Sequence, residues 1–143
     1  MQKMPRIVAV MTAFPYSIEQ EDSVQKARDM MTSLSIRHLP VMQDGELHGI
    51  VSDVDLRMAE TLRPEAAAEM PVGLVCRRDP YCVDIDAPLD QVVTAMAQRQ
   101  LDSAVVRKGG NLAGILTTTD VCRLLAKVLG QHYCQPAGED DVA

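Results

Sequence analysis

The chain repeats itself once, at a fixed offset and without a gap. Pro15-Tyr16-Ser17-Ile18 returns 65 positions later as Pro80-Tyr81-Cys82-Val83. Gly49-Ile50-Val51-Ser52-Asp53-Val54-Asp55 returns at the same offset as Gly114-Ile115-Leu116-Thr117-Thr118-Thr119-Asp120. A unit of about 60 residues is marginally stable alone and has to bury its apolar face against a neighbour. We therefore expect two similar units that pack about a pseudo-twofold axis, so that a site on one unit has a twin on the other.

The repeat also divides the chain. We expect a first unit over residues 1–60, a linker over 61–70, a second unit over 71–130 and a disordered acidic tail over 131–143. The 143-residue length leaves no room for a separate catalytic domain.

Each unit is predicted to follow the order strand, helix, strand, strand, helix. In the first unit, Asp22-Ser23 is a helix-capping pair before apolar residues at helical spacing over 24–34. The polar turn 43–46 contains Asp44-Gly45 and separates two apolar runs, which is typical of a β-hairpin. The expected strands are 16–18, 38–42 and 47–52 in the first unit and 81–85, 104–107 and 112–117 in the second. Further helices are expected to begin near 55, 89 and 120, which makes the fold class α+β.

Composition excludes several kinds of partner. The formal charge is −6 and aromatic residues make up 3% of the chain, whereas nucleic-acid polymers are held by basic faces and aromatic platforms. The apolar run Ile7 to Met11 is too short for a signal peptide or a membrane span. We therefore expect a cytoplasmic protein that binds neither nucleic-acid polymers nor membranes.

The sequence also lacks a recognisable pattern for catalysis or metal binding. Cys76, Cys82, Cys122 and Cys134 are separated by 6, 40 and 12 positions, which fits no zinc motif, so free and mostly buried thiols are expected. No motif sets a nucleophile beside an oriented base. We predict no catalytic residues, no metal ligands and no required cofactor.

The motifs quoted above resemble those of a CBS domain pair, the tandem regulatory module named after cystathionine beta-synthase and also called a Bateman module. The resemblance covers almost the whole chain. It rests on Ile36-Arg37-His38-Leu39-Pro40-Val41, on the turn with Gly45, on the two repeated segments 49–55 and 114–120, and on Met11-Thr12 before Pro15. It implies two α+β units with adenosine-type ligands in the cleft between their sheets.

By this resemblance, the residues at the two helix starts bind ribose and phosphate. A carboxylate accepts hydrogen bonds from two adjacent ribose hydroxyls, and a nearby hydroxyl side chain can bond sugar or phosphate oxygens. The candidates are Ser52, Asp55, Thr117 and Asp120. The alternative for each aspartate is a helix cap. Gly49 and Gly114 either admit a ligand or mark crowding between backbones.

The resemblance also suggests residues for the base and for phosphate. The candidates for the adenine pocket are Thr12, Tyr16, Ile18, Leu39, Pro40, Tyr81, Val83, Ala104 and Val105, with ordinary core packing as the alternative. The phosphate candidates are Arg37, His38, Arg57 and Arg123, with solvated surface charge as the alternative. The second unit departs from the pattern, because Asp102-Ser103 replaces Arg37-His38 and an acidic side chain opposes phosphate.

The function expected from this resemblance is regulation. The chain would sense an adenine nucleotide, AMP, ADP or ATP, and transmit binding by a conformational change to a partner protein in trans. S-adenosylmethionine or NAD are alternative ligands, and a structural dimerisation scaffold without nucleotide is the alternative function. The resemblance further implies a homodimer assembled through the helices.

Overall fold

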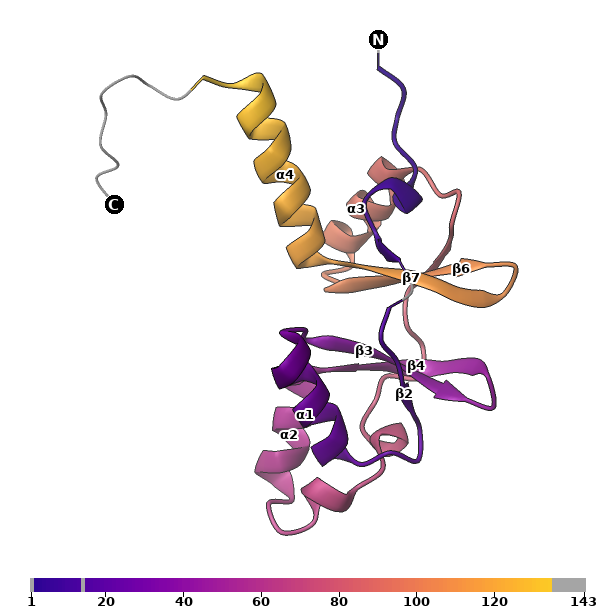
Figure 1. Cartoon of the computed structure of the whole chain (residues 1–143), viewed down its shortest axis with the longest axis vertical. Coiled ribbons are helices and arrows are strands. Elements are labelled where there is room, and N and C mark those ends of the chain that lie inside the picture. Colours follow the sequence, from indigo (N-terminus) through magenta and orange to yellow (C-terminus); the bar gives the residue numbers. More distant parts are fainter. Residues whose placement is uncertain (1, 14, 135–143) are drawn as a thin grey trace, which may run out of the picture.

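The computed structural model describes residues 2–13 and 15–134, which form two units stacked sheet to sheet (Figure 1). The first unit has a three-stranded sheet in the order β2 (Ile18–Glu19), β3 (His38–Gln43), β4 (Glu46–Ser52). Its outer face is covered by α1 (Val24–Leu34) and α2 (Asp53–Leu62). The second unit has a four-stranded sheet in the order β1 (Thr12–Ala13), β7 (Asn111–Thr117), β6 (Ser103–Lys108), β5 (Cys82–Asp84). Its helices are α3 (Leu89–Gln98) and α4 (Thr118–His132). The predicted α+β class and the order of elements in each unit are confirmed.

Local sequence signals account for the helix and hairpin ends. The Ser23 side chain accepts a hydrogen bond from the Lys26 N–H at 3.1 Å, which caps α1 as predicted. Asp44 and Gly45 both have positive φ, 50° and 80°, as a two-residue turn of type I′ requires. This turn joins Gln43 to its strand partner Glu46, and the predicted hairpin is confirmed.

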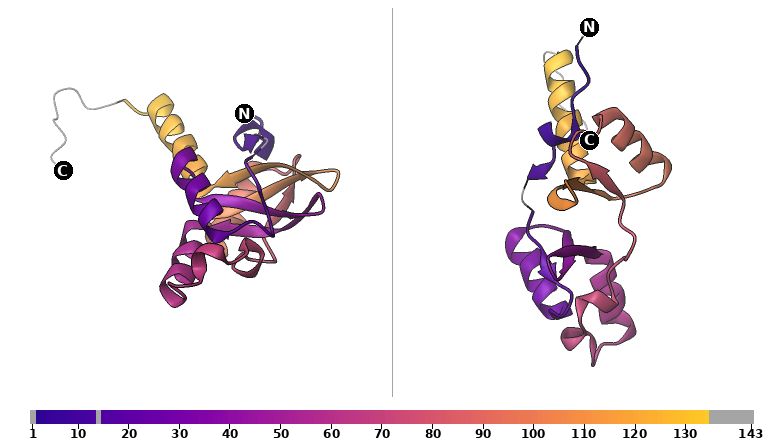
Figure 2. Two further views of the ribbon diagram at one scale, coloured as in Figure 1. Left: turned by 60° about the horizontal axis from the view of Figure 1, so that its bottom comes forward. Right: turned by 90° about the vertical axis from the view of Figure 1, so that its right-hand side faces the viewer.

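The segments that precede each repeat cross to the other unit. Thr12 and Ala13 pair in antiparallel fashion with Ile115 and Gly114 of the second unit. Arg77 likewise pairs with Ile50 of the first unit, through reciprocal backbone hydrogen bonds of 2.9 and 2.8 Å. Both connections run beside the contact between the sheets in Figure 2. The N-terminal segment of each repeat therefore joins the other folded unit: Thr12 and Ala13 belong to the sheet of the second unit, and Arg77 pairs with the sheet of the first.

This crossing also accounts for the two strand glycines. A Cβ on Gly49 would overlap the backbone carbonyl oxygen of Arg77, and a Cβ on Gly114 would lie 2.8 Å from that of Thr12. Of the two alternatives for these glycines, the structure supports crowding between backbones.

Apolar side chains fill three connected regions. Each unit has a core between its sheet and helices, and Ile7, from the N-terminal segment, is buried in the core of the second unit. A smaller cluster of Ile50, Val105 and Ile115 joins the two sheets face to face. Because one face of each sheet packs on helices and the other on the opposite sheet, the central strands are apolar on both faces.

The last helix extends further than predicted. α4 continues to His132, so the expected tail over 131–143 begins too early, and residues 135–143 lie outside the described residues. Beyond its first turns α4 projects away from the second unit (Figure 1), and none of its residues is fully buried. No helix in the described part of the chain is long and apolar enough to span a membrane.

Candidate functional site

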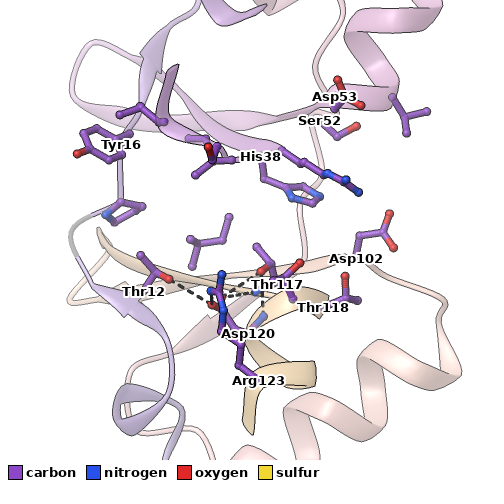
Figure 3. A pocket seen from close by; sticks show the side chains of 18 of the residues that line it. Thr12, Tyr16, His38, Ser52, Asp53, Asp102, Thr117, Thr118, Asp120 and Arg123 are labelled. Carbon is purple, nitrogen blue, oxygen red and sulfur yellow. Dashed lines mark hydrogen bonds and ion pairs between the residues drawn. The ribbon is translucent and has the colours of Figure 1, made fainter. Parts of the chain in front are cut away.

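A cleft of about 810 Å³ opens between the two units, a volume in the range of small-molecule sites. Figure 3 shows its two walls, with Tyr16 and His38 on the first unit's side and Thr117, Asp120 and Arg123 on the other. The lining residues are Thr12, Pro15, Tyr16, Leu34, Ser35, Ile36, Arg37, His38, Ser52, Asp53, Val54, Arg57, Asp102, Ile115, Thr117, Thr118, Thr119, Asp120 and Arg123.

The start of α4 orients the Asp120 carboxylate. Thr117 is the N-cap, and Asp120, three residues on, completes a capping box. Asp120 Oδ2 accepts the Thr117 N–H at 2.9 Å, while the Asp120 N–H donates to Thr117 Oγ1 at 3.3 Å. Asp120 Oδ1 has only a long contact of 3.5 Å from the Thr12 hydroxyl and an ion pair of 3.6 Å with Arg123. One carboxylate oxygen therefore holds the helix together, and the other is free to accept hydrogen bonds in the cleft.

A second capping box stands at the start of α2. The Ser52 N–H donates to Asp55 Oδ2 at 2.9 Å, and the Asp55 N–H donates to Ser52 Oγ at 3.2 Å. The alternative interpretation made each aspartate the N-cap of its helix. In the structure Ser52 and Thr117 take that position, and each aspartate lies three residues further on. Ser52 lines the cleft, whereas Asp55 does not.

The opposite wall carries His38 and Arg37 at the start of β3. Burial of the imidazole lowers the pKa of His38, and the charges of Asp102 and Asp55 oppose that shift. His38 therefore lies in the cleft mainly as a neutral hydrogen-bonding group at pH 7. The neighbouring Arg37 side chain is exposed and can follow an anion.

Arg57 is already engaged. Its guanidinium donates to Asp53 Oδ2 at 2.6 Å, and Arg28 bonds both Asp53 and Glu60. The Arg28 hydrogen bond lowers the pKa of Asp53, with a smaller contribution from Arg57. This network ties α1 to α2 and competes with phosphate for Arg57.

The structure separates the predicted site residues into two groups. Those that line the cleft are Thr12, Tyr16, Arg37, His38, Ser52, Arg57, Thr117, Asp120 and Arg123. Those that do not are Asp55, Ile18, Leu39, Pro40, Tyr81, Val83, Ala104 and Val105. Ile18 and Leu39 pack in the first core, while Ala104 is buried in the second core with Tyr81 and Val83 against it. Val105 lies in the cluster between the sheets, and Pro40 is fully buried. For these apolar residues the packing alternative holds, because helices or the facing sheet cover both faces of their strands.

Several cleft residues escaped the sequence prediction. Thr118 and Thr119 stand in the first turn of α4 and line the cleft. The Thr118 N–H donates to the Asp102 carbonyl oxygen at 3.0 Å, so it is not available to an anion. Their position between the two candidates Thr117 and Asp120, at a predicted helix start, was the signal that could have found them. No signal in the sequence distinguished Ile115 from the other apolar residues of β7.

No group of three or more potential metal ligands occurs among the described residues. All four cysteines are free, as predicted, but the expectation that most are buried is wrong, because Cys122 and Cys134 are exposed. Burial raises the pKa of Cys76 and of Cys82, which keeps these two thiols protonated and unreactive.

The family follows from comparison with known proteins. The CBS domain model matches residues 7–61 and 72–127, which is most of the chain. The protein therefore belongs to the CBS domain family and contains a tandem pair of these domains.

Several proteins are similar to this chain in sequence. The Bacillus subtilis protein YlbB is 32% identical over 120 residues, covering 82% of this chain and 80% of YlbB. A Methanocaldococcus jannaschii protein is 28% identical over 138 residues, covering 87% of this chain, which spans only 32% of that relative. Mycobacterium tuberculosis hypoxic response protein 1 is 28% identical, covering 81% of this chain and 82% of that protein.

Solved structures agree on the fold. A Vibrio cholerae protein described as an acetoin utilization protein, AcuB, has a TM-score of 0.82 at 27% identity, covering 94% of this chain and 100% of that one. The CBS domain pair of protein MJ0100, in complex with 5′-methylthioadenosine and S-adenosyl-L-methionine, has a TM-score of 0.79 at 20% identity, covering 88% and 99%. The protein CBSX2 in complex with AMP has a TM-score of 0.74 at 24% identity, covering 86% and 97%.

Proposed function

We propose that this CBS domain pair is a regulatory module that binds an adenosine-containing nucleotide, AMP, ADP or ATP, in the cleft between its units. The observation that carries the proposal is the divided role of Asp120, whose Oδ2 is committed to the capping box while Oδ1 faces the cleft. A carboxylate oxygen that is free to accept hydrogen bonds, with the Thr12 hydroxyl beside it, is suited to two vicinal ribose hydroxyls.

In this proposal the walls supply the remaining contacts. The base lies against Tyr16, which is 59% exposed, and against the apolar side chain of Ile115. Phosphate is received by Arg37 and Arg123, with His38 as a hydrogen-bond donor. Arg123 can leave Asp120 at little cost because its side chain is 75% exposed and the pair is weak. The complexes of the MJ0100 pair and of CBSX2 hold adenosine derivatives, which supports the choice of ligand class.

The ligand would act by joining the two units. Because the cleft takes its walls from both, a bound nucleotide favours one relative arrangement of the units over another. Regulation requires a coupling free energy of about 1–3 kcal/mol between ligand and output. In this proposal the output acts on a partner protein in trans.

A homodimer is the assembly that the surface supports. α4 exposes Leu125, Val128 and Leu129 along one face, and α2 exposes Val54, Met58 and Leu62 at intervals of four residues. Unpaired apolar helix faces of this kind are typical of association surfaces. Sedimentation equilibrium of wild type and of Leu129→Glu tests the homodimer. We expect the variant to be monomeric, and an unchanged mass would contradict the proposal.

The experiment for the proposed function is thermal unfolding of stripped protein with AMP, ADP, ATP, S-adenosylmethionine or NAD. A ligand that binds only the folded state adds about 2.7 kcal/mol at 100 times its Kd, or several degrees for a chain of this size. Asp120→Asn keeps an acceptor for the capping box but turns an amide towards the ribose, and should remove the shift. Asp90→Asn, in the first turn of α3 and outside the cleft, is the matched control.

A shift with S-adenosylmethionine or NAD alone would replace the adenine nucleotide by the alternative ligand. No shift with any of the five compounds on a folded protein would overturn the nucleotide-binding proposal and favour the dimerisation scaffold.

A further inference from the structure

The repeat gives the Asp120 site a twin around Asp55, and we infer that Arg77 closes this twin, so that one chain takes one nucleoside ligand. The inference rests on the proposed function and adds the number of sites and the residue that sets it.

Thr12 and Arg77 occupy equivalent positions, 65 residues apart, and the backbone holds them alike. Thr12 pairs with Ile115 and Arg77 with Ile50, both in antiparallel geometry. Each side chain therefore starts from the same place relative to the aspartate that follows the strand.

The two side chains meet the same atom of their aspartate with different chemistry. In the Asp120 site a short hydroxyl lies 3.5 Å from Oδ1. In the Asp55 site the Arg77 Nε lies 4.0 Å from Oδ1, and Oδ2 is again committed to the capping box. The Arg77 side chain is 68% exposed, so the ion pair itself is weak. Charge does not separate the two sites, because Asp120 Oδ1 also has an arginine, Arg123, at 3.6 Å. What differs is that the long Arg77 side chain stands in the place of the short Thr12 side chain and fills the position that a ribose has to enter.

The twin also lacks equivalents of two of the phosphate candidates. The repeat places Asp102 and Ser103 where the first site has Arg37 and His38. Neither residue brings a positive charge to the twin, and Asp102 itself lines the cleft that contains Asp120.

The tyrosines at equivalent positions, Tyr16 and Tyr81, also differ in their surroundings. Tyr16 is 59% exposed and lines the cleft. Tyr81 packs against the core of the second unit and carries the Arg99 guanidinium 4.9 Å above its ring. Among the described residues, the cleft is lined by Thr12, Tyr16 and Asp120 but by none of their twins (Figure 3).

Isothermal titration with AMP counts the sites. We expect one AMP per wild-type chain, a loss of affinity of about tenfold or more in Asp120→Asn, and a change of less than about twofold in Asp55→Asn. Both substitutions keep an acceptor for the capping box, and circular dichroism checks that both variants fold.

Arg77→Thr, which copies Thr12 into the twin, tests the cause. The probe is adenosine, because it carries no phosphate and needs no equivalent of Arg37 or His38. We expect wild type to bind one adenosine per chain and Arg77→Thr to bind two, with Asp55→Asn on the Arg77→Thr background removing the second.

The contrary results are distinct from one another. Two AMP molecules per wild-type chain, or equal losses in Asp55→Asn and Asp120→Asn, would overturn the closure and leave the proposed function standing. A single adenosine in Arg77→Thr, or weaker AMP binding in that variant, would overturn the role of Arg77. Binding of neither probe to wild type would overturn the inference together with nucleotide binding.

Discussion

The crossing of chain segments between the units predicts a large effect for the smallest possible substitution, Gly49→Ala. Gly49 is buried on β4, directly beneath the Arg77 backbone, and the added Cβ would overlap the Arg77 carbonyl oxygen and lie 3.0 Å from its carbonyl carbon. The obstacle is backbone, so a side-chain rotation cannot relieve it. The Arg77 segment has to move away from Ile50, and its two hydrogen bonds of 2.9 and 2.8 Å are broken or lengthened.

The size of the effect follows from those two bonds. A hydrogen bond contributes about 0.5–1.5 kcal/mol, and a buried group left unpaired costs about 1–3 kcal/mol, so we expect a loss of about 2–4 kcal/mol. At about 3 °C per kcal/mol for a chain of this length, Tm should fall by roughly 6–12 °C.

Urea and thermal unfolding followed by circular dichroism measure this change. Gly130→Ala is the matched control, because Gly130 lies in α4 with nothing within 4 Å of an added Cβ. It should stabilise the protein by about 0.5–1 kcal/mol, the helix preference of Ala over Gly. Equal midpoints for Gly49→Ala and wild type would refute the crossing geometry.

Three further changes test the core and the charged groups. Leu56→Ala, at a fully buried position of α2, should cost about 2–5 kcal/mol in urea unfolding. His38→Gln should flatten the acid dependence of stability: because the folded state lowers the pKa of His38 from its ordinary 6.5, the unfolded state binds more protons and wild-type stability falls as pH drops below about 6.5. Arg28→Met removes the partner that lowers the pKa of Asp53 from its ordinary 3.8, so its destabilisation should be present at pH 7 and disappear as the pH falls below that value.

Each of these has a contrary outcome. A Leu56→Ala variant within 1 kcal/mol of wild type would contradict the assignment of Leu56 to the first core. Parallel pH profiles for wild type and His38→Gln would show that the imidazole is not desolvated. A constant difference between wild type and Arg28→Met from pH 7 to pH 2 would show that Arg28 acts by packing and not through the carboxylate.

Much of the fold follows from local signals in the sequence. Ser23 caps α1 because its hydroxyl meets a free N–H in the first turn, and Asp44-Gly45 form the hairpin turn because both adopt positive φ. The repeat itself predicts two units, since neither can bury its sheet alone. The same signals placed Asp55 and Asp120 at helix starts, although the aspartates complete capping boxes and the preceding Ser52 and Thr117 are the caps.

The adenine walls could not be predicted in the same way. Alternation along a strand tells that Ala104 and Val105 face opposite sides, but not which side is which. Both faces of β6 are covered, one by the second core and one by the sheet of the other unit. Apolar residues therefore occur on both faces, and the sequence pattern carries no mark of the cleft.

The sequence by itself determined the repeat, the order of elements, the family and the position of the two carboxylates, because each depends on contacts between residues close in the chain or on direct comparison of its halves. Only the tertiary structure decided that Thr12 meets Asp120 and that Arg77 meets Asp55. Those contacts join residues from segments that cross between the units, and the crossing is selected by the packing of two sheets and not by any local preference. Two halves with the same pattern thereby acquire different contacts at their equivalent carboxylates.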